Sequence, residues 1–233
     1  MFKKKKKVIQ AVACKLIAQA NPKSVVSEQF RTLRTNINFS SPDAEIETLL
    51  FTSASPGEGK STVASNTAVV YAQSGKKVLL IDADMRKPTV HYTFHMTNTT
   101  GLSNLLTRQS TFADVIKMSD IPNLDVITCG PIPPNPAELL GSKTMAVILK
   151  SLKDEYDLIV FDAPPILSVA DAQIISNKVD GTVLVLNAGE TEKEVVGKAH
   201  DALKTSKANV IGAVVNNFQM DKNHYYQYYG TPE

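Results

Sequence analysis

The chain has 233 residues, of which 43% are hydrophobic and 21% are charged, a composition typical of a globular protein with a sizeable core. Its formal net charge of only +2 argues against a dedicated nucleic-acid-binding protein, so no nucleic-acid partner is expected. The two cysteines, Cys14 and Cys129, exclude a disulfide framework and fit a reducing compartment, and no run of residues is apolar and long enough to span a membrane.

The N-terminus begins with five consecutive lysines, residues 3–7, followed by an apolar segment. A secretory signal has this order, but Gln10 and Lys15 interrupt the apolar segment, which argues against one. We therefore predict that residues 1–22 form a basic arm outside the core. Two interpretations stay open: a solvated tail, or a segment attracted to anionic lipid or to an acidic partner.

The next feature is a set of charged residues with helical spacing. Glu28, Arg31 and Arg34 recur every three residues, so they are expected to share one face of a helix. On spacing alone, this face is either a solvated charged surface or a contact surface.

After residue 47 the chain alternates short apolar runs with helical patterns. We predict strands at 49–52, 77–82, 124–128, 158–162, 182–187 and 210–216, and helices at about 61–74, 111–118, 137–153, 169–178 and 191–206. Strands that are apolar nearly throughout are expected to be buried on both faces of a parallel sheet. The pattern predicts an α/β fold, a doubly wound, mainly parallel sheet with helices on both faces, in one domain from 23 to 218. Residues 219–233 are predicted to form a tail.

A phosphate-binding loop is predicted at residues 54–61, Ala-Ser-Pro-Gly-Glu-Gly-Lys-Ser, between the first strand and the helix that follows it. Backbone N–H groups of such a loop surround phosphate oxygens at the positive end of the helix. We expect Lys60 to reach the outer phosphates and the Ser61 hydroxyl to ligate Mg²⁺. The predicted nucleotide-binding residues of this segment are Ser55, Pro56, Gly57, Glu58, Gly59, Lys60, Ser61 and Thr62.

Acidic residues end two of the predicted strands. Asp82 and Asp162 lie at the carboxyl ends of strands, where α/β sheets bind ligands, and Asp84 follows closely. Since Mg²⁺ prefers hard oxygen ligands, Ser61, Asp82 and Asp162 are the candidate metal residues. Asp82 is either a second metal contact or a general base, and Asp84 could share either task; the alternative for each is strand-end capping. Arg86 and Lys87 either neutralise transferring phosphate or are surface charges.

Four segments taken together resemble one family, the bacterial tyrosine kinases (BY-kinases), which are P-loop enzymes of capsule and exopolysaccharide synthesis. They are residues 54–61, 80–88, 130–140 and 159–165. Partition-type and cell-division ATPases share the paired aspartates but carry a signature lysine near the start of the loop, where this chain has Ser55. The resemblance covers about residues 22–230. It implies an ATP- and Mg²⁺-dependent protein-tyrosine kinase with Lys60, Asp82 and Asp84 as catalytic residues and Asp82 as the base.

The C-terminal tail holds four of the seven tyrosines, Tyr225, Tyr226, Tyr228 and Tyr229. Their crowding at a polar chain end favours a substrate segment on a mobile terminus, although an aromatic patch folded onto the domain is an alternative. The resemblance implies autophosphorylation of these tyrosines between neighbouring subunits. It also implies that Glu28, Arg31 and Arg34 assemble the subunits into a ring.

Asn216, at the end of the last strand, resembles a base-contacting asparagine of related ATPases, although a turn-forming role is an alternative.

The resemblance further implies how the protein is placed in the cell. A separate transmembrane activator, protein-tyrosine substrates and a cytoplasmic location at the inner face of the membrane are implied as well. The rival interpretations are a partition-type ATPase acting as an assembly switch, and a nucleotide-gated scaffold without an enzymatic role.

Overall fold

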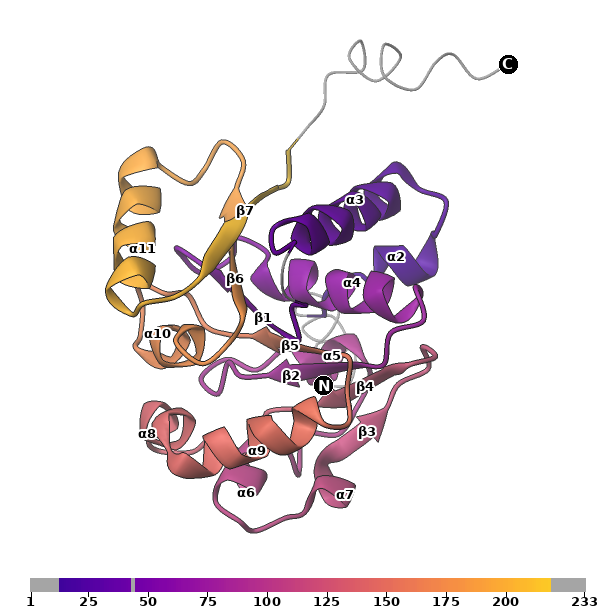
Figure 1. The fold of residues 1–233 in the computed structure, drawn as a ribbon, viewed down its shortest axis with the longest axis vertical. Helices are drawn as coiled ribbons and strands as arrows, with labels where there is room; N and C mark the ends of the chain where they lie inside the picture. Colours follow the sequence, from indigo (N-terminus) through magenta and orange to yellow (C-terminus); the bar gives the residue numbers. More distant parts are fainter. Residues whose placement is uncertain (1–12, 43–44, 219–233) are drawn as a thin grey trace, which may run out of the picture.

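The computed structural model of the chain describes residues 13–42 and 45–218, which form a seven-stranded sheet between two layers of helices (Figure 1). The strand order is β3-β4-β2-β5-β1-β6-β7. All neighbouring strands run parallel except the edge pair β3 and β4. The strands are β1 (Thr48–Ser53), β2 (Val78–Asp82), β3 (Ile116–Met118), β4 (Leu124–Ile127), β5 (Leu158–Asp162), β6 (Gly181–Asn187) and β7 (Val210–Asn216).

The central strands are buried on both faces because alternate side chains enter the two layers. In β1, Leu49 and Phe51 pack against one layer of helices, whereas Leu50 packs against the other, and all three side chains are fully buried. The strands β2 and β5 alternate in the same way. The predicted doubly wound, mainly parallel sheet is therefore confirmed.

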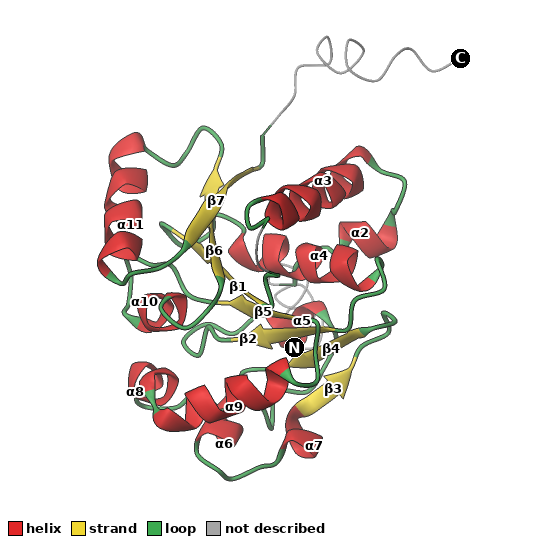
Figure 2. Ribbon diagram, in the orientation of Figure 1, coloured by secondary structure: helices red, strands yellow, loops and turns green. Residues whose placement is uncertain are grey.

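The two helical layers differ in chain position (Figure 2). One face of the sheet is covered by helices from the first part of the chain: α2 (Ile17–Ala20), α3 (Val25–Phe39), α4 (Lys60–Ala72) and α5 (Val90–Thr93). The opposite face is covered by helices from the later part: α6 (Leu102–Leu106), α7 (Phe112–Val115), α8 (Pro136–Gly141), α9 (Lys143–Lys153), α10 (Asp171–Ser176) and α11 (Lys193–Thr205).

Two predicted helices differ from the structure. The helix predicted at 111–118 is wrong beyond residue 115, because Ile116–Met118 forms the edge strand β3, antiparallel to β4. A short apolar run does not distinguish helix from strand, and here pairing with β4 decides. The helix predicted at 137–153 is two helices, since Ser142 has extended dihedrals and its side chain caps α9 by accepting the N–H of Met145.

The prediction that all of residues 1–22 lie outside the core is wrong for the segment around α2. Ala18 is fully buried against the helical layer that contains α4. Its N–H donates to Asn66 Oδ1 at 3.0 Å, and Asn66 Nδ2 donates to the carbonyl of Lys15 at 2.8 Å. This part of the arm therefore belongs to the folded domain. Residues 1–12 and the predicted tail, 219–233, lie outside the described residues.

Candidate active site

The phosphate-binding loop, residues 54–61, joins the end of β1 to the start of α4. Gly57 and Gly59 have φ angles of +86° and +92°, a region that side chains rarely adopt. A Cβ on Gly59 would also lie 2.0 Å from Nδ2 of Asn216, so only glycine fits there. The loop thus presents its backbone at the positive end of a 13-residue helix, as phosphate binding requires.

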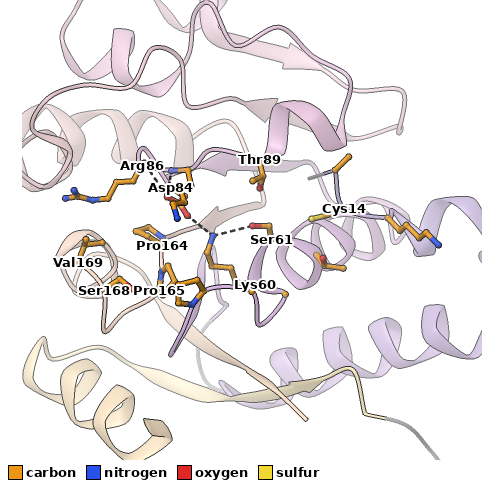
Figure 3. A pocket seen from close by; sticks show the side chains of 17 residues that line it. Cys14, Lys60, Ser61, Asp84, Arg86, Thr89, Pro164, Pro165, Ser168 and Val169 are labelled. Atoms are coloured by element: carbon orange, nitrogen blue, oxygen red, sulfur yellow. Dashed lines mark hydrogen bonds and ion pairs between the residues drawn. The ribbon is translucent and has the colours of Figure 1, made fainter. Parts of the chain in front are cut away.

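Lys60 lies among carboxylates, and Figure 3 shows its contacts with Asp84 and Ser61. Its Nζ is 2.9 Å from Oδ2 of Asp84, 3.4 Å from Oδ1 of Asp162 and 3.3 Å from Oγ of Ser61. Burial alone would lower the pKa of Lys60, but Asp162 and Asp84 raise it above its usual range. The lysine therefore stays charged, ready to bind an anion. The structure brings together four of the residues that the sequence predicted for this site.

Asp82 and Asp162 are paired in register across β2 and β5, and both are fully buried. Burial, followed by the charge of Asp162, raises the pKa of Asp82 to about 8. Burial also raises the pKa of Asp162, although Lys60 opposes that shift. Two carboxyl groups buried side by side thus resist ionisation when no further cation is bound.

Each of these two carboxyl groups has one oxygen without a hydrogen-bond partner among the described residues. Asp82 Oδ2 accepts the N–H groups of Thr89 and Val90, at 3.1 and 3.0 Å, but its Oδ1 has none. Asp162 Oδ2 is likewise unpaired. Buried polar atoms without a partner are costly, so these oxygens are suited to a ligand.

The oxygen atoms present fit Mg²⁺. The described residues contain no cluster of three or more His, Cys, Asp or Glu side chains that could hold a metal by itself. Mg²⁺, however, is typically held by one or two carboxylates together with waters and substrate phosphates. The unpaired oxygens of Asp82 and Asp162, with the Ser61 hydroxyl nearby, provide such a partial set.

Asp84 is fixed by hydrogen bonds to both of its oxygens. Oδ1 accepts the backbone N–H groups of Arg86 and Lys87, at 3.3 and 3.0 Å, and Oδ2 accepts from Lys60. It therefore has no unpaired oxygen comparable to Oδ1 of Asp82.

Arg86 is more than a surface charge. Its Nε and Nη2 donate to the two oxygens of Asp171, both at 3.0 Å, and the Asp171 side chain is fully buried. This bidentate pair fixes the guanidinium group on Asp171, and Arg86 is among the residues that line the cavity beside Lys60. Sequence reasoning missed Asp171; its only signal was an acidic residue in the first turn of the predicted helix 169–178.

A cavity of about 730 Å³ opens beside these groups. Figure 3 shows Lys60 and Ser61 at its centre, Cys14 on one side and Pro164, Pro165 and Val169 on the other. Sequence reasoning also missed Cys14, which is placed here because the N-terminal segment packs on α4. Burial raises the pKa of the Cys14 thiol, so the group is neutral near pH 7.

A second groove, of about 450 Å³, is formed by α3, the start of α4 and the end of β7, and Val26, Phe30, Val63 and Asn216 are among its lining residues. Asn216 Nδ2 donates to the backbone carbonyl of Glu58 at 3.1 Å. The asparagine therefore contacts the phosphate-binding loop directly and faces the groove beside it.

The remaining predicted residues lie away from the carboxylates. Glu28, Arg31 and Arg34 are on α3, where Arg31 pairs with Glu28 and donates to the carbonyl of Pro22 at 2.8 Å. Arg34 donates to the carbonyl of Val70 at 2.8 Å, which joins α3 to α4. The tail tyrosines lie outside the described residues.

Comparison with known proteins gives consistent matches. Residues 46–191 match the family model of an AAA domain. Tyrosine-protein kinase YwqD of Bacillus subtilis is 53% identical over 218 residues, which cover 94% of this chain and 92% of that protein. The crystal structure of the chimerical protein CapA2B2 superposes with a TM-score of 0.85 at 43% identity, over 89% of this chain and 93% of that one. The kinase domain of Escherichia coli tyrosine kinase ETK gives a TM-score of 0.83 at 35% identity, over 90% and 84%.

Proposed function

Because the chain belongs to the bacterial protein-tyrosine kinases, we propose that it is an autokinase that phosphorylates its own tail tyrosines as well as other proteins. The proposed targets in the tail are Tyr225, Tyr226, Tyr228 and Tyr229. The observation that supports this proposal is the position of Lys60 and Asp84 in the wall of an open cavity, with Asp162 buried within 3.4 Å of Lys60 and Asp82 paired with it in register. Such a cavity has room for an acceptor side chain next to the phosphate-binding loop.

The chain's own groups account for binding and orientation. Backbone N–H groups of residues 54–61 surround the phosphates, and Lys60 exchanges Asp84 for the outer phosphate oxygens. Ser61 and Asp162 would hold Mg²⁺, which would offset negative charge on the phosphates when bound. The adenine base is proposed to lie in the groove lined by Asn216. Positioning and charge supply most of the catalysis of phosphoryl transfer.

Asp82 is proposed as the base that accepts the tyrosine proton. Its Oδ2 is held by two backbone N–H groups, and Oδ1 has no partner among the described residues. Both oxygens of Asp84 are occupied, so Asp84 is better suited to orienting Lys60. A free tyrosine hydroxyl has a pKa of about 10, so a carboxylate within hydrogen-bond reach assists its deprotonation.

We further propose that the protein assembles into a ring through α3. The side chains of Glu28 and Arg31 are 54% and 31% exposed, so they are accessible to a neighbouring subunit. A ring would bring the tail of one subunit to the cavity of the next. Each added phosphate carries nearly two negative charges, so repulsion between phosphorylated tails is expected to loosen the ring. Light scattering before and after phosphorylation tests this step, and an unchanged particle size would exclude it.

The cellular setting is proposed by analogy. None of the helices in residues 13–42 and 45–218 is long and apolar enough to cross a membrane. We propose that a separate transmembrane protein activates the kinase at the inner face of the membrane and that the pair regulates capsular or exopolysaccharide synthesis. The five-lysine run near the N-terminus is suited to an anionic surface there.

The deciding experiment is incubation of the pure protein with ATP and Mg²⁺, followed by mapping of phosphotyrosine by mass spectrometry. Phosphate on the tail that is absent from Lys60→Met, and from a variant with all four tail tyrosines changed to Phe, supports the autokinase. ATP hydrolysis without any phosphotyrosine, even after an activator segment is added, would favour a nucleotide-driven assembly switch instead.

A further inference from the structure

Glu58 is the only acidic residue of the phosphate-binding loop, residues 54–61. It places a carboxylate among the backbone groups that are expected to bind a polyanion, where like charges repel. A glutamate that pointed into solvent would need no explanation, but this residue is only 4% exposed. Its buried position therefore requires a structural or functional reason.

Both carboxylate oxygens of Glu58 have partners. Oε2 accepts the backbone N–H of Ser55 at 2.8 Å, within the loop itself. Oε1 accepts the hydroxyl of Thr191, which lies between β6 and α11, and the Thr191 oxygen in turn accepts the N–H of Asn187 at 2.8 Å. A continuous series of hydrogen bonds thus joins the end of β6 to the phosphate-binding loop.

A second connection joins the same loop to β7. Asn216 Nδ2 donates to the Glu58 carbonyl at 3.1 Å and occupies the space that a side chain on Gly59 would need. The loop is therefore attached to two neighbouring strands through Glu58, once by its side chain and once by its backbone. The Glu58 side chain does not line the cavity next to Lys60.

We propose that Glu58 is a positioning residue, and that its contact with Thr191 holds the phosphate-binding loop in the conformation that accepts nucleotide. The Glu58 carboxylate acts on the loop backbone and does not touch the phosphates. The contact also ties the loop to residues 187–192, so a displacement of that segment is transmitted to the nucleotide site.

Charge repulsion and loop positioning predict opposite results for the same substitution. If the charge of Glu58 were its main effect, Glu58→Ala would remove repulsion and tighten ADP binding. If Glu58 positions the loop, the same change weakens ADP binding, because the loop must then be ordered when the nucleotide binds. A hydrogen bond to a charged group is strong enough to change the Kd by about tenfold or more.

The test is the Kd for ADP with Mg²⁺, measured by titration calorimetry on the full chain, for wild type, Glu58→Ala, Thr191→Val and Thr191→Ser. Thr205→Val is the matched control, because this exposed threonine only donates to the carbonyl of Asp201, at 2.8 Å, within α11. We expect about tenfold weaker binding for Glu58→Ala and Thr191→Val. Thr191→Ser, which keeps the hydroxyl, and Thr205→Val are expected to bind like wild type.

Two further readouts separate positioning from a loss of folding. Thermal unfolding without nucleotide verifies that each variant is folded at the titration temperature. In the double variant Glu58→Ala/Thr191→Val the effects on Kd should be smaller than the sum of the single effects, since each single change already removes the contact between these two side chains. Tighter binding by Glu58→Ala, additive effects in the double variant, or a Thr191→Val Kd within a factor of two of the control would overturn the proposal.

Discussion

Nζ of Lys60 lies closer to Asp84, at 2.9 Å, than to Asp162, at 3.4 Å. The ammonium group that is expected to bind phosphate is therefore held by a carboxylate of the chain itself. Asp84→Asn removes this competing charge, so we expect the Kd for ADP to fall by about tenfold. Phosphotransfer should become slower in the same variant, because Lys60 loses the carboxylate that orients it.

Titration calorimetry with ADP and phosphotyrosine formation with ATP measure these two effects separately. Lys60→Met serves as the comparison, because it should lose both binding and transfer. Weaker ADP binding by Asp84→Asn would contradict the competition between Asp84 and phosphate for Lys60, and an unchanged rate of phosphotransfer would contradict the orienting role of Asp84.

Asp82 is expected to destabilise the nucleotide-free protein at alkaline pH. Its pKa is about 8 in the folded state, whereas an unfolded aspartate has a pKa of about 3.9. Below the lower value both states are protonated and the residue has no effect. As pH rises from the lower value to the higher one, only the unfolded state releases the proton, so folding loses stability until the loss is complete near pH 8.

Asp82→Asn should therefore unfold at a higher temperature than wild type, with a small difference at pH 5 and a larger one at pH 9. The gain at pH 9 should reach at least about 2 kcal/mol in the free energy of unfolding. Calorimetric unfolding without nucleotide measures it. An equal gain at both pH values would show that the charge of Asp82 is not the cause.

Asp180 should show the opposite pH dependence. Burial raises the pKa of this carboxyl group, but hydrogen bonds from Thr48 and Lys153 outweigh burial and lower it. Its contribution to stability is present above the unfolded pKa of about 3.9 and is lost as pH falls through the folded pKa. Asp180→Asn should cost about 1 kcal/mol at pH 7, a modest value because water screens the pair with Lys153.

Urea unfolding of wild type and Asp180→Asn at neutral and acidic pH measures this effect. The difference between their midpoints should shrink as the pH falls below about 4. Asp157→Asn is a suitable comparison, because Asp157 also accepts a backbone N–H, that of Lys77 at 2.6 Å, but lies in another turn. A midpoint difference for Asp180→Asn that stays constant down to acidic pH would contradict the ionic contribution.

The main parts of the site could be predicted from sequence because they are local or are fixed by the sheet. Residues 54–61 carry their own turn chemistry, in which Gly57 and Gly59 take left-handed dihedrals. Asp82 and Asp162 end strands that are adjacent in the sheet, so a parallel arrangement brings them together without further information.

The parts that sequence could not predict depend on contacts between distant segments. Thr191 contacts Glu58 across 133 positions, and Asp171 contacts Arg86 across 85. No local pattern marks either pair. The edge strand β3 was mistaken for helix because its three residues gain their hydrogen bonds only from β4. The N-terminal segment looked like an arm because its burial depends on α4.

That segment leads to the last prediction, since it places Cys14 in the wall of the main cavity. N-ethylmaleimide should modify Cys14 slowly near neutral pH and faster as pH rises, because burial raises the pKa of the thiol. Cys129 should stay unmodified, since it is fully buried and its pKa is raised to about 12 by burial and by Asp82 and Asp84. Modified protein should transfer phosphate at no more than about one tenth of the unmodified rate, because the adduct displaces the reacting groups.

The Cys14→Ser variant separates this local effect from general damage by the reagent. It should keep its phosphotransfer rate after the same treatment, and intact-mass spectrometry should show no adduct on it. Bound ATP should also slow the modification of Cys14 in the wild-type protein, because the nucleotide phosphates and the thiol face the same cavity. Full activity of a protein that is stoichiometrically modified at Cys14 would show that the acceptor side chain enters elsewhere, and the N-terminal wall would then have only a structural role.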